Sequence, residues 1–143
     1  MPDISLFHSF FVFAVNKEKL TIYFFSASSE IFDVISDELF GKWNFHLVTL
    51  APGTIEINLE EIPDLIILDT LSLQLELLEH IKRHPRLGSS PVLVVDDYQE
   101  QVLIDKIVEK GASEYLHIDD FIDRLSQTVE KIIHSSMFRS IIL

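Results

Sequence analysis

Short apolar runs alternate with amphipathic segments along this sequence, and this alternation limits the available folds more than any other feature. The runs are rich in β-branched and aromatic residues, as strands buried on both faces are. We expect strands at residues 20–25, 45–50, 65–69, 92–95 and 114–117. Because strands that alternate with helices form a parallel sheet covered on both sides, the pattern predicts a doubly wound α/β domain with five parallel strands.

Apolar residues at helical spacing fill the segments between these strands. We expect helices at residues 28–40, 73–84, 99–110 and 119–134, and a short or irregular one at 54–61. Ser28 or Ser29 is the expected cap of the first helix. The inward faces of the last two helices are expected to carry Leu103, Ile104, Ile107, Val108, Phe121, Ile122, Leu125, Val129, Ile132 and Ile133.

The length and composition fit one domain with a full core, since 48% of the 143 residues are hydrophobic and 24% are charged. We assign residues 19–143 to that domain and residues 1–18 to a hydrophobic N-terminal extension. The run Leu6–Val15 is only about half as long as a membrane span, and no basic residues precede it as they do in a signal peptide. We expect its phenylalanines to be buried on the domain itself, in a homodimer contact or against another protein.

The charge balance excludes some classes of partner. With 23 acidic residues against 11 basic ones, the net charge is −12, which would repel a nucleic-acid backbone. No cysteine is present, so thiol chemistry and cysteine-based metal sites are excluded and a cytoplasmic location is favoured. We therefore expect neither direct nucleic-acid binding nor a membrane interaction.

Polar and acidic residues follow the expected strands, at the sheet edge where open α/β sheets bind their ligands. These residues are Ser26, Ala27, Asp69, Asp96, Asp97, His117, Asp119 and Asp120. No Lys or Arg stands among them. The pattern predicts an acidic rim in which Asp97, Asp119 and Asp120 accompany Asp69 and Asp96.

Four segments carry a resemblance to a known family. Residues 63–69 read PDLIILD, residues 81–85 IKRHP, residues 91–95 PVLVV and residues 111–116 GASEYL. In this order and spacing they resemble the receiver domain of bacterial two-component response regulators. The resemblance covers residues 19–133 and implies a flavodoxin-like three-layer sandwich with a part in two-component or phosphorelay signal transduction.

In that family an aspartate after the third strand accepts a phosphoryl group and two acids after the first strand hold Mg²⁺. A hydroxyl, a lysine and a switch aromatic complete the site. By this resemblance Asp69 occupies the phosphoacceptor position and Tyr115 that of the switch aromatic. The positions of the acidic pair, the hydroxyl and the Lys-Pro pair hold, in that order, Ser26, Ala27, Asp96, Ile118 and Asp119.

These replacements remove the charges that phosphoryl transfer needs, because a divalent ion and an ammonium neutralise the developing negative charge. We also expect Asp96 to place a like charge within about 4 Å of Asp69. We infer a pseudo-receiver that acts as a protein–protein interaction module, without phosphorylation at Asp69, enzymatic activity or a cofactor. The expected partners are other signalling proteins, such as a histidine kinase or an output protein, or a second copy of the chain.

Other interpretations of the same residues stay open. The domain could be an atypical receiver that is phosphorylated with Mg²⁺, or a metal-dependent hydrolase that uses Asp69, Asp96 and Asp119. Asp69 could also be a residual metal ligand or a plain strand-end residue. The Asp96–Asp97 pair could imitate a phosphoryl charge or cap the next helix. Tyr115 suits either a partner contact or packing at the edge of the core.

Overall fold

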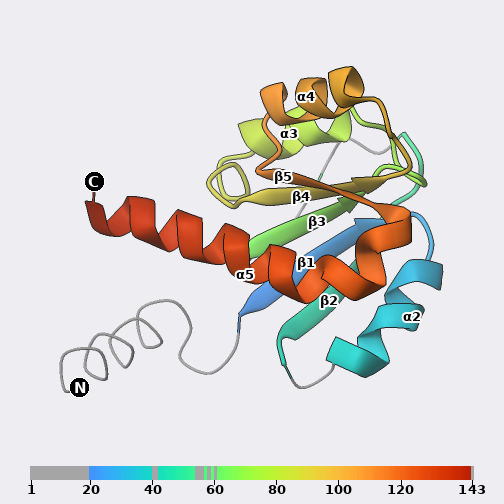
Figure 1. The fold of residues 1–143 in the computed structure, drawn as a ribbon, viewed down its shortest axis with the longest axis horizontal. Coiled ribbons are helices and arrows are strands. Elements are labelled where there is room, and N and C mark those ends of the chain that lie inside the picture. Colours follow the sequence, from blue (N-terminus) through green and yellow to red (C-terminus); the bar gives the residue numbers. More distant parts are fainter. Residues whose placement is uncertain (1–19, 40–41, 54–56, 58, 60, 143) are drawn as a thin grey trace.

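The computed structural model describes residues 20–39, 42–53, 57, 59 and 61–142. They form a five-stranded parallel sheet in the order β2-β1-β3-β4-β5 (Figure 1). The strands are β1 (Thr21–Ser26), β2 (Asn44–Thr49), β3 (Leu65–Asp69), β4 (Val92–Asp96) and β5 (Glu114–His117). The strand positions predicted from the sequence are therefore confirmed to within one residue at each end.

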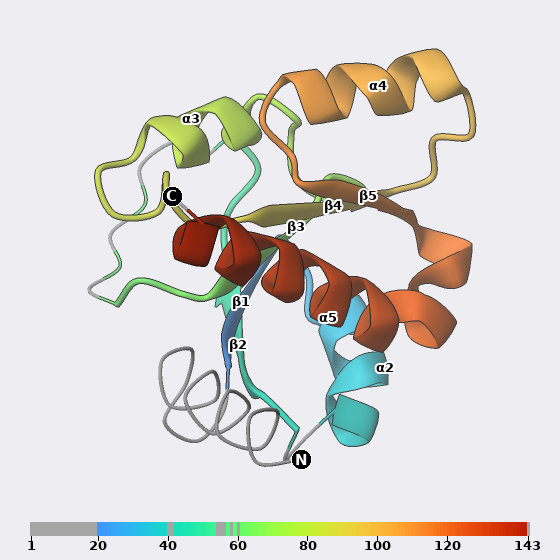
Figure 2. The same cartoon turned by 60° about the vertical axis from the view of Figure 1, so that its left-hand side comes forward.

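Helices cover both faces of this sheet. They are α2 (Glu30–Leu39), α3 (Leu77–Arg83), α4 (Gln101–Glu109) and α5 (Ile118–Ile142). Helices α3 and α4 lie on one face, whereas α2 and α5 lie on the other (Figures 1 and 2). The doubly wound, flavodoxin-like three-layer sandwich expected from the sequence is confirmed.

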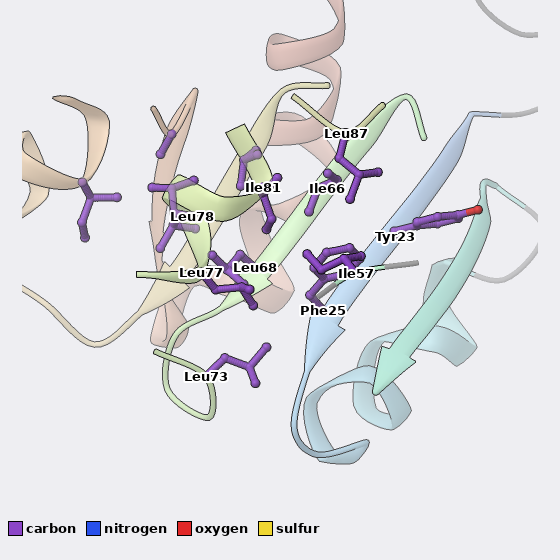
Figure 3. Close-up of a cluster of buried hydrophobic side chains, with 14 residues drawn as sticks. Tyr23, Phe25, Ile57, Ile66, Leu68, Leu73, Leu77, Leu78, Ile81 and Leu87 are labelled. Carbon is purple, nitrogen blue, oxygen red and sulfur yellow. The ribbon is translucent and has the colours of Figure 1, made fainter. Parts of the chain in front are cut away.

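The central strands are buried from both sides because each face of the sheet meets its own hydrophobic cluster. On the α2/α5 face, side chains of β1, β3 and β4 pack against Phe121, Leu125 and Val129 of α5. On the opposite face, Leu77, Leu78 and Ile81 of α3 pack onto β3 (Figure 3). A fully buried Leu, Ile or Phe contributes roughly 1.5–3 kcal/mol, so these two clusters dominate the stability of the fold.

The apolar faces of α4 and α5 differ from the prediction. Ile107 is the only buried residue of α4, while Leu103 and Val108 are 37% and 47% exposed. Helix α4 lies over β5, the edge strand, so part of its apolar face has no sheet beneath it (Figure 2). On α5, Ile122 is 49% exposed although the other predicted core residues of that helix are buried.

The expected cap of the first helix is confirmed, whereas other helix boundaries depart from the expectation. The hydroxyl of Ser28 accepts a 3.1 Å hydrogen bond from the backbone N–H of Glu30, so Ser28 supplies the side-chain cap of α2. Helix α3 begins at Leu77 instead of residue 73, and α5 runs on to Ile142. The hydrophobic extension, its boundary at residue 19 and most of the segment 54–61 lie outside the described residues. Among the described helices, none is long and apolar enough to cross a membrane.

Candidate functional site

Asp69 ends β3 at the carboxyl edge of the sheet, and its side chain is held by three hydrogen bonds. The hydroxyls of Ser26 and Ser72 both donate to Oδ2 at 2.8 Å, and the backbone N–H of Leu71 donates to Oδ1 at 2.9 Å. The residue is only 2% exposed. Both carboxylate oxygens are therefore already engaged by groups of the chain itself.

The two serine hydroxyls form a closed set of hydrogen bonds. Ser26 Oγ accepts from the backbone N–H of Ser28 at 3.1 Å, and Ser72 Oγ accepts from that of Ala27 at 2.9 Å. A hydroxyl carries one proton, and both protons go to Asp69. The 3.1 Å approach of the two serine oxygens is then a contact between acceptors. Donors thus solvate the buried Asp69 side chain, as a polar group at this depth requires.

The loop after β3 is shaped by the same aspartate. The Leu71 N–H bond to Oδ1 is an Asx-type turn, and the backbone N–H of Leu73 also bonds to the carbonyl of Asp69 at 3.1 Å. Leu73 is then buried in the core below the loop (Figure 3). These bonds turn the chain before α3 can start, which is why the predicted first turn of that helix is missing.

Asp96 ends β4 and has partners of its own. Its Oδ2 accepts from the hydroxyl of Thr70, and its Oδ1 accepts from the backbone N–H of Asp97 at 2.7 Å. Burial raises the pKa of Asp96, and the neighbouring charge of Asp97 adds to the increase. The capping interpretation of the Asp96–Asp97 pair is wrong, because α4 begins after Glu100 without any side-chain cap.

The two strand-end aspartates belong to opposite faces of the sheet. Asp69 is paired in register with Val95, so the alternation of side chains places it with Val95 on the α2/α5 face. Asp96, one residue further, falls on the α3/α4 face. Each carboxylate accordingly has a separate hydrogen-bond network. The expected approach of Asp96 to within about 4 Å of Asp69 stays a prediction.

Tyr115 lies on β5, at the edge of the α3/α4 cluster. Its hydroxyl donates to the backbone carbonyl of Tyr98 at 2.9 Å, and the two rings stack with centroids 6.5 Å apart. The pKa of Tyr115 is raised to about 12, mainly by burial; the hydrogen bond to Tyr98 lowers it, and the nearby charges of Asp96 and Asp97 contribute to the increase. The geometry favours packing at the core edge for this residue.

Of the remaining predicted rim residues, Asp97 follows β4 and the others lie at the end of β5 and the start of α5. Asp97, Asp119 and Asp120 are exposed. His117 Nδ1 accepts from the backbone N–H of Asp119 at 3.0 Å, whereas its buried Nε2 has no partner among the described residues. No group of three or more potential metal ligands occurs in the described part of the chain. The rim is thus a row of separate side chains.

Sequence reasoning missed two hydroxyl residues of this site, Thr70 and Ser72. Both stand in the loop directly after Asp69, where the sequence reads Asp-Thr-Leu-Ser. Aspartate followed closely by hydroxyl residues is a turn signal, because such side chains bond to nearby backbone and to one another. That pattern could have indicated a self-satisfied loop.

Comparisons with known proteins identify the fold. No protein-family model matches the sequence, and no curated protein sequence matches it. Solved structures do match. The signal receiver domain of a protein described as a LuxO repressor, from Vibrio parahaemolyticus, is 16% identical, with a TM-score of 0.70 over 87% of this chain and 97% of that one. A response regulator from Desulfuromonas acetoxidans is 14% identical, with a TM-score of 0.67 over 79% of this chain and 95% of that one.

A third solved structure is the receiver domain of NtrX from Brucella abortus. It is 19% identical, with a TM-score of 0.60 over 79% of this chain and 98% of that one. Against a longer NtrX structure the chain covers only 29% of the length. The fold of this chain is therefore that of response-regulator receiver domains.

Proposed function

We propose that this chain is a receiver-type signalling domain that acts through contacts with other signalling proteins while Asp69 stays unphosphorylated. The observation that carries this proposal is the engagement of both Asp69 oxygens by Ser26, Leu71 and Ser72. A nucleophile must present a free oxygen lone pair to phosphorus. Here both oxygens are buried, and three of the roughly four acceptor positions of the carboxylate are already taken by donors of the chain.

The charge requirements of phosphoryl transfer support the same proposal. An Asp69 oxygen would attack phosphorus while the donor's leaving group departs, and a metal ion or a fixed cation stabilises the charge that develops. Ser26 and Ala27 offer no carboxylate to Mg²⁺, and Ile118 offers no ammonium. These three positions therefore lack the groups that would compensate for disrupting the network around Asp69.

A domain of this kind would signal by surface recognition. A histidine kinase, an output protein or a second copy of the chain are the partners we propose. The proposal assigns no enzymatic step and no resident cofactor to the domain, and Mg²⁺ would matter only if Asp69 were phosphorylated.

Treatment with acetyl phosphate and Mg²⁺, followed by intact-mass spectrometry, tests the proposal. We expect no phosphoryl adduct on the wild type. A variant that combines Ser26→Asp, Ala27→Asp and Ile118→Lys supplies the missing charges and serves as the positive control. A stoichiometric wild-type adduct that Asp69→Asn abolishes and Asp97→Asn leaves intact would overturn the proposal and favour a phosphorylatable receiver.

A further inference from the structure

A hollow of about 690 Å³ lies at the edge of the sheet opposite Asp69. Its walls come from the end of α3, the segments that lead into β4 and β5, and the C-terminal half of α5. Strands β4 and β5 start here, whereas Asp69 and Asp96 stand where strands end. The hollow is therefore separate from the receiver-type site.

The hollow is lined by Lys82, Lys131 and Glu114, so its own charged residues carry one positive charge in excess although the chain as a whole carries a net charge of −12. A second, shallower hollow adjoins it, and both are lined by Lys82. The cationic residues of the two hollows are Lys82, Arg83, Lys106, Lys110 and Lys131. Their acidic residues are Glu79, Glu109 and Glu114, so two positive charges remain in excess. The local charge is thus opposite in sign to that of the chain.

Lys82 is held in place without a negative partner. Its aliphatic stem crosses Gly111, where an added Cβ would lie 2.8 Å from the Lys82 Cγ. Its ammonium donates to the backbone carbonyl of Ser90 at 3.1 Å. Gly111 has a φ of +123°, so the close approach and the backbone conformation both favour glycine there. The lysine is therefore positioned by the fold before any ligand arrives.

The other cations of the hollows differ from Lys82 in their pairing. Lys131 pairs with Glu114 at 3.1 Å and Lys110 pairs with Glu79 at 3.3 Å. Lys82 forms no ion pair within the described residues, and partial burial lowers its pKa. A half-buried ammonium that has only a carbonyl partner gains free energy when an anion binds to it.

The remaining lining groups indicate what kind of anion would fit. The hydroxyls of Ser89, Ser113 and Ser135 line the hollow and make no hydrogen bond within the part of the chain that the structure describes. Hydroxyl donors beside an ammonium suit the several acceptor oxygens of a phosphate group. Val108 and Ile132 provide an apolar wall for the rest of a ligand.

We propose that this hollow binds a phosphorylated small molecule about the size of a mononucleotide, with the phosphate on Lys82 and the serine hydroxyls. The volume falls in the range of roughly 300–1,000 Å³ that small-molecule sites occupy. The ligand would bridge α3, β5 and α5, so its binding would tie α3 to two elements that come much later in the sequence.

Titration calorimetry on the full chain at low salt tests this site with two matched pairs of probes. These are adenosine monophosphate with adenosine, and glucose 6-phosphate with glucose. We expect saturable binding of at least one phosphorylated probe, none of its dephosphorylated partner, and weaker binding at higher salt because the contact is ionic. The proposal is wrong if neither phosphorylated probe binds, or if a dephosphorylated probe binds equally well.

Variants of Lys82 locate the binding. Lys82→Met keeps the stem against Gly111 and removes the charge, so we expect the affinity to fall at least about tenfold, which is the loss of one charge-assisted contact. Lys82→Arg should retain binding, and Lys42→Met, which alters a lysine paired with Glu130, should leave it unchanged. If Lys82→Met fails to fold, Ser113→Ala replaces it and should also weaken binding. Full affinity in a folded Lys82→Met chain would overturn the proposal.

Discussion

The hydroxyl of Ser26 donates a 2.8 Å hydrogen bond to Oδ2 of Asp69, across the neighbouring strands β1 and β3. By resemblance to receiver domains, Ser26 stands where a carboxylate would face this aspartate across a metal ion. A hydroxyl in that place satisfies Asp69 directly. We therefore expect Asp69 to be stable without a bound cation.

Removal of the Ser26 hydroxyl should destabilise the fold. In Ser26→Ala a buried carboxylate loses one donor, and we expect the free energy of unfolding to fall by about 1–3 kcal/mol. Urea denaturation followed by circular dichroism measures this change. Ser113→Ala, which removes an exposed hydroxyl outside the network, should change it by less than about 0.5 kcal/mol. Equal losses of unfolding free energy in the two variants would show that the Ser26 bond stabilises the fold no more than an exposed hydroxyl does.

Restoring the acidic pair should make the domain depend on a metal ion. In the double variant Ser26→Asp and Ala27→Asp, carboxylates crowd Asp69, so the melting temperature should fall when no divalent ion is present. Added Mg²⁺ should raise that temperature again by binding the native state. Wild-type protein should show no such rise in differential scanning calorimetry. A rise of similar size in both proteins would contradict the account.

Asp96 should give the stability an identifiable pH dependence. Burial raises its pKa above the ordinary 3.8, so the native state holds the proton more tightly than the unfolded chain does. The contribution of Asp96 to stability is therefore fully present below pH 3.8 and is lost as the pH rises through the native pKa.

Asp96→Asn should remove this pH dependence. The Thr70 hydroxyl can then donate to the carbonyl of Val95 instead, which lies 3.2 Å away. We expect urea denaturation to show that the variant is at least as stable as wild type at neutral pH and loses its advantage in acid. Asp123→Asn, which alters an exposed carboxylate on α5 that does not contribute to the Asp96 pKa, is the control. If Asp96→Asn is instead destabilised most at neutral pH, the native state favours the ionised form of Asp96.

The Tyr115 phenol should ionise at an unusually high pH. Its pKa is raised to about 12, so tyrosinate absorbance after a rapid pH jump should show one phenol that titrates well above the ordinary value of 10. Tyr115→Phe should abolish that transition and cost about 0.5–1.5 kcal/mol through loss of the bond to the Tyr98 carbonyl. If Tyr115→Phe instead removes a transition near the ordinary value of 10, the Tyr115 phenol is exposed to solvent.

The sequence predicts the sheet well because the strand signal is local. Runs such as Leu65–Asp69 and Val92–Asp96 are apolar up to their final aspartate and are buried throughout. The start of α3 could not be predicted from periodicity, because apolar spacing does not reveal the turn that the Asp69 side chain forms with the backbone N–H of Leu71. Periodicity also assigned Leu103 of α4 to the core, although an edge strand gives that helix too little sheet to cover.

The candidate site is also predicted in part: its strand residues are identified from the sequence and its loop residues are not. The resemblance identifies Asp69, Ser26 and Tyr115 as site positions, because these residues lie in or next to strands. Ser72 and Thr70 lie in the loop after β3, and only the folded chain shows that their hydroxyls bond to two different carboxylates. Residue types thus indicate what the site has lost, whereas the structure identifies what replaces it.

The backbone amide of Leu71 is the most direct reporter of the central claim, because its N–H bonds to Oδ1 of Asp69. Its ¹H–¹⁵N resonance can be followed while millimolar Mg²⁺ and then beryllium fluoride, a mimic of the phosphoryl group, are added. We predict no saturable shift of the Leu71 resonance, since both carboxylate oxygens already have partners. A saturable shift of Leu71 that disappears in Asp69→Asn would contradict the claim and show that Asp69 is still open to a metal ion and a phosphoryl group.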